Sequence, residues 1–145
     1  AREEILQALI NHKYGSKEDS LLHLAAMLNE ANAVRLLLNK GVNVNEQNAL
    51  LHIPLHLAAG AGNEEIVDIL IREGNADKDV LDAKNQAAIH YAVNNKNLGV
   101  VKLLSNLGMN VNVAGSGRNA MKLSSLYIAI SSSNYDKRDL CLDIV

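Results

Sequence analysis

The sequence predicts an all-α solenoid of stacked helix–turn–helix units that are joined by hairpin-like finger loops. One phrase occurs three times at intervals of 33 and 34 residues, as Leu22-His23-Leu24-Ala25-Ala26, Leu55-His56-Leu57-Ala58-Ala59 and Ile89-His90-Tyr91-Ala92-Val93. A glycine follows each histidine eighteen positions later, at Gly41, Gly74 and Gly108. An apolar pair also follows each histidine at a fixed distance. Such periodicity is typical of repeat proteins, in which each unit buries its apolar face against its neighbours.

Each unit is expected to contain two antiparallel helices. In the middle unit, residues 55–59 are rich in small side chains, which allows close packing of the first helix. The second helix is amphipathic, with an apolar stripe made by Ile66, Val67, Ile69 and Leu70. Gly62 and Asn63 separate the two helices, and Gly74 is expected to end the second in a left-handed conformation. Residues 75–86 are largely polar and rich in turn-forming residues, so we expect them to form the loop that leads to the next unit.

These residues resemble the ankyrin repeat, whose signature is Thr-Pro-Leu-His-x-Ala in a unit of about 33 residues. The copy most similar to it reads Ile53-Pro54-Leu55-His56-Leu57-Ala58-Ala59, and the resemblance covers residues 20–145. In the first and third units, Ser20-Leu21 and Ala87-Ala88 replace the Thr-Pro pair. The resemblance implies that the repeated histidines His23, His56 and His90 are structural and hydrogen-bond neighbouring loop backbone.

We expect a single domain over residues 1–145. It divides into an N-terminal helix with a short loop (1–19), two repeats (20–52 and 53–86), a third repeat with a lengthened finger (87–123) and a truncated fourth repeat (124–145). Residues 3–10 match the second-helix pattern of residues 64–71. In the fourth unit Tyr127 takes the histidine position; a competing register places Lys122 there. The stripe that ends at Val145 without its glycine indicates a fragment of a longer protein.

The composition argues against several classes of function. Fourteen basic and sixteen acidic residues, with no basic cluster beyond residues 136–139, give no electrostatic footprint for nucleic acid. No apolar run approaches the length of a membrane span, so we expect no membrane insertion. One cysteine and no glycosylation sequon favour an intracellular location, in the cytoplasm or nucleus, or in a host cytosol if the chain is a secreted effector.

The sequence predicts no catalytic, cofactor or metal site. The repeated histidines lie one unit apart, whereas metal ligands must lie within a few ångströms of one another. Cys141 lies on a predicted core stripe, where a free cysteine behaves as a small hydrophobe. Gly115-Ser116-Gly117 lacks the spacing and the Lys-Ser/Thr of a phosphate-binding loop. We therefore expect a chain that is not an enzyme.

The resemblance implies that a partner is bound by the finger tips and by the exposed end of each first helix. The residues at these positions are Lys17, Asp19, Met27, Leu28, Leu50, His52, Lys84, Gln86, Asn94 and Asn95. Two features are unusual: Leu51 stands where the family has glycine, and Met27, Leu28 and Leu50 are apolar at positions that normally face solvent. The resemblance implies that the finger and the helix end of successive units are neighbours, so we expect Leu50 and His52 to form one apolar spot with Met27 and Leu28. Adjoining exposed apolar residues mark interaction surfaces. The alternative is local packing, in which Leu51 folds back onto the stack and the first finger covers Met27 and Leu28.

The sequence therefore predicts a non-catalytic, monomeric module that binds another protein through a concave surface of fingers and inner helices. The alternative is that the array is the targeting or scaffolding arm of a larger enzyme, channel or secreted effector. Partner identity is not encoded in the repeat pattern.

Overall fold

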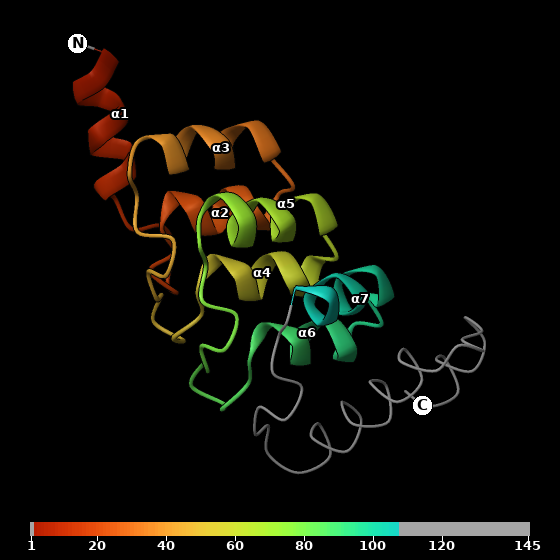
Figure 1. Cartoon of the computed structure of the whole chain (residues 1–145). Helices are drawn as coiled ribbons and strands as arrows, with labels where there is room; N and C mark the ends of the chain where they lie inside the picture. The colour runs from red at the N-terminus through yellow and green to blue at the C-terminus, as the bar shows by residue number, and fades with distance from the viewer. Residues whose placement is uncertain (1, 108–145) are drawn as a thin grey trace, which may run out of the picture.

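The computed structural model describes residues 2–107, and these residues form a stack of helices (Figure 1). The helical segments are α1 (Arg2–Asn11), α2 (Leu21–Met27), α3 (Ala31–Asn39), α4 (Pro54–Ala61), α5 (Glu64–Asp68), the π-helical turn η1 (Ile69–Glu73), α6 (Ala88–Asn94) and α7 (Leu98–Asn106). In this part of the chain the β structure is one isolated bridge between Tyr14 and Asp19. The all-α solenoid expected from the sequence is confirmed.

The helices form two layers that each run along the stack. The inner helices α2, α4 and α6 pack side by side, and the outer helices α3, α5 and α7 cover them, with η1 continuing α5. Figure 1 shows the finger loops at one end of the inner helices and the short helix–helix turns at the other. Helix α1 runs at a steep angle to the stack and contacts α2. Gly108 and the expected fourth repeat lie outside the described residues.

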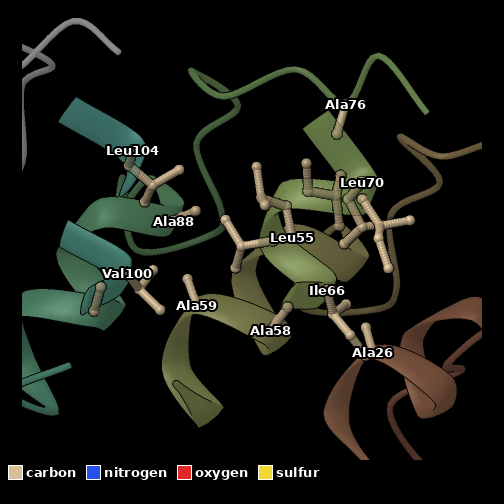
Figure 2. Packing of buried hydrophobic residues seen from close by; sticks show 14 of the residues in the cluster. Ala26, Leu55, Ala58, Ala59, Ile66, Leu70, Ala76, Ala88, Val100 and Leu104 are labelled. Carbon is tan, nitrogen blue, oxygen red and sulfur yellow. The ribbon is translucent and has the colours of Figure 1, made fainter. Parts of the chain in front are cut away.

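The core is built from aliphatic side chains and alanine. Leu55, Ile66 and Leu70 are fully buried, together with Ala58 and Ala59 of α4. Figure 2 shows these two alanines between Ala26 on one side and Ala88 and Val100 on the other. Small side chains let neighbouring helices approach closely, so the core within residues 2–107 is packed from aliphatic side chains without phenylalanine or tryptophan.

Asparagines at the starts of the outer helices link one unit to the next. Gly62 ends α4 in the left-handed conformation, with φ 78°, and Asn63 precedes α5, as the sequence predicts. The side-chain amide of Asn63 donates to the Ala26 carbonyl oxygen at 2.8 Å. Asn97 repeats this contact with the Ala59 carbonyl at 2.9 Å. Each amide satisfies a carbonyl group near the end of the preceding inner helix, where helical partners are lacking.

The signature histidines connect each inner helix to the following finger. His23 Nδ1 accepts a hydrogen bond from the Ser20 backbone N–H at 3.1 Å, and its Nε2 donates to the His52 carbonyl at 2.8 Å. His56 accepts from the Ile53 N–H at 3.1 Å and donates to the Gln86 carbonyl at 3.0 Å. Because Nδ1 is an acceptor and Nε2 a donor, both rings are neutral.

His90 continues the pattern on its Nδ1 side, where it accepts from the Ala87 N–H at 2.9 Å. Within residues 2–107 its Nε2 has no hydrogen-bond partner. The register of His23 and His56 predicts that its acceptor belongs to the finger after α7, which lies outside the described residues.

Burial sets the protonation state of these histidines. Burial lowers the pKa of His23, of His90 and of His56, the last to about 4, and the backbone hydrogen bonds to each ring offset only part of this effect. Protonation would place a charge in the core and convert the Nδ1 acceptor into a donor that faces another N–H group.

Gly74 does not end the second outer helix in the left-handed conformation, so this expectation is wrong. Its φ is −98°, and the left-handed residue is the next one, Asn75, with φ 55°. The cause is the extra residue of the 34-residue interval between His56 and His90, which η1 absorbs as a π turn with a Gly74 N–H to Ile69 O bond of 3.1 Å. In the preceding unit, which lacks this residue, Gly41 is left-handed with φ 76°.

Gly74 is instead required by close contacts. A Cβ atom at this position would lie 2.8 Å from the Leu70 carbonyl oxygen and 3.1 Å from side-chain atoms of Leu38 and Val44. At Gly41 a Cβ atom would meet no atom within 4 Å. The two glycines occupy the same place in the repeat for different physical reasons.

This difference predicts opposite responses to asparagine. Gly41→Asn should change the free energy of unfolding by only a few tenths of a kcal/mol, because asparagine tolerates the left-handed conformation and space is available. Gly74→Asn should destabilise by about 1–3 kcal/mol, because its Cβ forces the backbone to move. Urea unfolding of the two variants measures both values. Equal destabilisation by the two substitutions would contradict the conclusion that close contacts require glycine at position 74 but not at position 41.

The neutral histidines predict a loss of stability in mild acid. A histidine with a folded-state pKa below its unfolded value of 6.5 stabilises the fold fully above that pH and loses this contribution as the pH falls toward 4. For His56 alone the loss amounts to roughly 3 kcal/mol. Chemical unfolding at pH 7.5, 6.0 and 5.0 should show the decline, and His56→Asn should have a shallower pH slope. A flat profile for the wild type would contradict a buried neutral His56.

Candidate partner-binding surface

Three fingers form a row along one end of the inner helices. They comprise residues 14–19, 42–52 and 75–86. The Ala49 N–H donates to the Lys17 carbonyl at 2.7 Å, and the Ala83 N–H donates to the Leu50 carbonyl at 3.1 Å. One main-chain hydrogen bond therefore ties each finger to the next and aligns their tips.

Two polar side chains fix the conformation of the second and third finger tips. Asn48 Oδ1 accepts from the backbone N–H groups of Leu50 and His52, each at 3.0 Å. Asp82 Oδ1 repeats this with Lys84 and Gln86, each at 2.9 Å. Local side-chain-to-backbone bonds of this kind hold a turn without help from a partner. The finger tips are thus preorganised, which lowers the entropic cost of binding.

Asp82 also anchors the third finger to the inner helices. Its Oδ2 accepts a hydrogen bond from the Tyr91 hydroxyl and lies 3.0 Å from Nε2 of His52, which in turn lies 3.0 Å from the Tyr91 oxygen. Burial alone would raise the pKa of Asp82, but the hydrogen bonds from Tyr91 and from the backbone of Gln86 and Lys84 lower it. Burial and the bond to Asp82 raise the pKa of Tyr91. The Asp82 side chain is shielded from solvent, so the cluster holds the finger in place.

One residue of each finger adopts the left-handed conformation at the same place in the repeat. These residues are Glu18, Leu51 and Asn85, with φ of 57°, 62° and 58°. Asparagine adopts this conformation readily, whereas a leucine without local hydrogen-bonding ability does so at an energetic cost. Leu51 is 43% exposed and its neighbour Leu50 is 40% exposed. Leu51 therefore does not fold back onto the stack, and the second finger presents two leucines to solvent.

The structure separates the residues that the sequence analysis grouped into one apolar spot. Leu50 lies in the finger that precedes α4, whereas Met27 ends α2 and its carbonyl oxygen lies 3.5 Å from the Asn63 amide, beyond the other end of α4. Met27 and Leu28 are exposed and are not covered by the first finger. His52 is largely buried and bonded to Asp82.

The remaining predicted residues divide between the same two ends. Lys17 and Lys84 are exposed on the fingers, while Asp19 accepts a bond from the Asn48 amide at 2.7 Å. Gln86 is half-buried. Its backbone carbonyl accepts a hydrogen bond from His56, and its backbone N–H donates to Asp82. At the far end of α6, Asn94 is exposed and the Asn95 amide donates to the Gly60 carbonyl at 2.8 Å. These residues do not form one continuous site.

Sequence reasoning missed several exposed apolar residues. Leu81 is exposed in the third finger, and Ile5, Leu9 and Leu36 are exposed on α1 and α3. The signal for Leu81 was available, because it is the one leucine in a finger that is largely polar. The exposure of Leu36 could not be read from the sequence, since its equivalent Ile69 is buried.

The described residues offer neither a metal site nor a membrane span. Among residues 2–107, no three histidine, cysteine or carboxylate side chains lie close enough together to hold a metal ion. Nor does this part of the chain contain a helix with the length and apolarity that a bilayer crossing requires.

Comparison with known proteins identifies the family. A family model described as "Ankyrin repeats (3 copies)" matches residues 1–82 and, in a second alignment, residues 55–140. The two alignments together cover most of the chain, including all the helices described above.

Several curated proteins are similar to the chain. The "Nuclear factor NF-kappa-B p105 subunit" of Gallus gallus is 36% identical over 107 residues, which are 71% of this chain and 11% of that protein. "Glycerophosphocholine phosphodiesterase" of Schizosaccharomyces pombe is 31% identical over 144 residues, 98% of this chain and 12% of that protein. A "Putative ankyrin repeat protein" of fowlpox virus is 28% identical over 103 residues, 71% of either chain. The chain thus spans only a small part of the first two relatives. From the matched repeats and the stacked helix pairs, it follows that this chain belongs to the ankyrin repeat family.

Proposed function

We propose that the chain is a non-catalytic module that binds another protein through its row of finger tips. Ankyrin repeats are generally protein–protein interaction modules. The fingers support this role because they are exposed, aligned by main-chain hydrogen bonds and held by Asn48 and Asp82. The binding surface runs from Lys17 across Leu50 and Leu51 to Lys84.

The observation that carries the proposal is the conformation of Leu51. A leucine held at φ 62° destabilises the fold, and its exposed side chain recovers little of that energy by packing. Backbone strain at an exposed position is a reason to look for a function of the side chain. Leu50 and Leu51 together provide the apolar centre that interfaces use as an anchor, with Lys17 and Lys84 as the polar rim.

The balance of charge favours a protein as the partner. The chain has a formal net charge of −2, and nucleic-acid binding depends on basic residues that neutralise phosphates. The single cysteine and the lack of a glycosylation sequon support an intracellular site of action.

A second candidate function is that of a targeting or scaffolding arm within a larger protein. The similarity to a phosphodiesterase that is about eight times longer favours this candidate, because 98% of this chain matches only 12% of that enzyme. Sequencing the complete transcript that encodes the chain tests it. An open reading frame that adds a catalytic or channel domain would support the arm, and one that adds no further domain would exclude it.

Leu50→Asp should weaken binding without unfolding the protein. A buried apolar anchor contributes roughly 2 kcal/mol or more to an interface, whereas Leu50 is exposed in the free chain. Quantitative capture from lysate with wild-type and variant baits, followed by Kd measurement on the recovered protein, gives the effect. Arg72→Ala, on the exposed side of η1, is the control and should retain binding. Loss of folding by Leu50→Asp, with unchanged binding per folded molecule, would contradict the proposal.

Leu51→Asn should stabilise the fold and weaken binding. Asparagine relieves about 1 kcal/mol of strain at the left-handed position, and it removes an apolar contact with the partner. The reciprocal change Asn85→Leu, at the equivalent place in the next finger, should destabilise by a similar amount. Thermal unfolding and Kd measured on the same samples separate the two effects. Stabilisation with unchanged affinity would mean that Leu51 has no role in binding.

A further inference from the structure

The tips of the three fingers fold into the same turn. The backbone N–H groups of Glu18, Leu51 and Asn85 each donate to the carbonyl group three residues earlier in the chain, at 3.2, 2.9 and 3.0 Å. The same three residues are the left-handed ones of their fingers. The residue that precedes each of them therefore has the same place in the turn and the same backbone setting.

These preceding residues form a row in which the chemistry alternates. They are Lys17, Leu50 and Lys84, each six residues before the signature histidine of its unit, and we call them the tip row. All three side chains are exposed. Leu50 thus lies between two lysines, one in the finger on either side.

The two lysines of the tip row are not neutralised by the rest of the described chain. None of the ion pairs within residues 2–107 involves Lys17 or Lys84, whereas carboxylates pair with Lys13, Arg35, Lys40 and Arg72. Glu18 holds the left-handed place and is not a member of the tip row, and the Asp82 side chain is shielded from solvent. The tip row therefore presents two positive charges to solvent with an apolar side chain between them.

The packing of the inner helices sets the spacing of the tip row. Helices α2, α4 and α6 lie side by side (Figure 1), and packed helices lie about 8–10 Å apart. The main-chain hydrogen bonds from Ala49 to Lys17 and from Ala83 to Leu50 keep the tips aligned. Successive members of the tip row are therefore about 9 Å apart.

An extended peptide in the polyproline II conformation matches this spacing. Such a chain advances about 3.1 Å per residue and completes a turn every three residues, so side chains at i, i+3 and i+6 share one face about 9 Å apart. In a regular β-strand these side chains would alternate between opposite faces. An amphipathic α-helix needs a continuous apolar groove, whereas the tip row has leucine in the second finger alone.

We propose that the tip row binds an extended segment of a partner protein with an acidic residue, an apolar residue three positions later and a second acidic residue three positions after that. This inference rests on the proposed function and specifies the chemistry of the partner. The apolar side chain of the segment lies on Leu50 and Leu51, and the two carboxylates pair with Lys17 and Lys84. Exposed ion pairs are individually weak, so the lysines mainly select the partner while the leucines anchor it.

The test uses two fluorescein-labelled peptides with blocked ends and a proline-rich backbone. The acidic peptide reads Glu-Pro-Pro-Leu-Pro-Pro-Glu, and the basic peptide has lysine in place of both glutamates. Fluorescence anisotropy with the full chain at low salt should show at least roughly tenfold tighter binding of the acidic peptide, because its charges complement the tip row. High salt should reduce this difference, because exposed charges are screened.

Charge exchange in the chain locates the site. The double variant Lys17→Glu with Lys84→Glu should reverse the preference, so that the basic peptide binds at least roughly tenfold more tightly than the acidic one. The matched control is Lys96→Glu, at an exposed lysine beyond the other end of α6, which should keep the preference of the wild type. Chemical unfolding checks that the variants are folded, and their unfolding transitions should be nearly unchanged because the substituted side chains are exposed.

Three results would overturn the inference: equal affinity for the two peptides, no saturable binding of either, or a preference for the acidic peptide that survives the double substitution. Tighter binding of a stapled helical peptide with the same three side chains two turns apart would also overturn it, because the occupant would then be a helix. The proposed function would still stand after any of these results if Leu50→Asp weakens binding of the protein captured from lysate. Loss of that effect as well would reject both.

Discussion

The structure depends on a hydrogen bond from a neutral, buried histidine to the carbonyl group of the next finger. Nε2 of His23 and of His56 donates to a backbone carbonyl of the finger in the following unit. Nδ1 of the same ring accepts from the backbone N–H of the residue that precedes its own helix. A single ring thus fixes where the helix begins and where the next finger lies. The second and third fingers are exposed at their tips, yet each is anchored to a buried histidine of the core.

The stack also shows how a repeat tolerates an extra residue. The interval between His56 and His90 is one residue longer than the one before it, yet the fingers stay aligned. The π turn η1 takes up the insertion on the outer layer, where one wider turn disturbs only local backbone bonds. The inner layer, which positions the histidines and fingers, is unaffected. Regularity is preserved in the inner layer, which positions the fingers, and relaxed in the outer layer.

The sequence predicted the fold well because the repeat period is a global signal. The helix pair, the separator Gly62-Asn63 and the aliphatic core follow from spacing and residue size alone. Two finer expectations were wrong for physical reasons. Glycine is required at position 74 because a Cβ atom there would lie too close to the Leu70 carbonyl oxygen, and this contact cannot be predicted from a sequence pattern. Met27 was placed beside Leu50 because repeat position was treated as proximity, although the two residues lie beyond opposite ends of the inner helices.

Apolar side chains are exposed in two different parts of the described chain. Leu36 of α3 is exposed, although its equivalent in the next unit, Ile69, is buried against α3. The leucines of the second finger are exposed in the middle of the array, where the fold gains nothing from them and Leu51 adds strain. Packing within the fold therefore gives no reason for the exposed leucines of the second finger. The proposed contact with a partner protein would give them one.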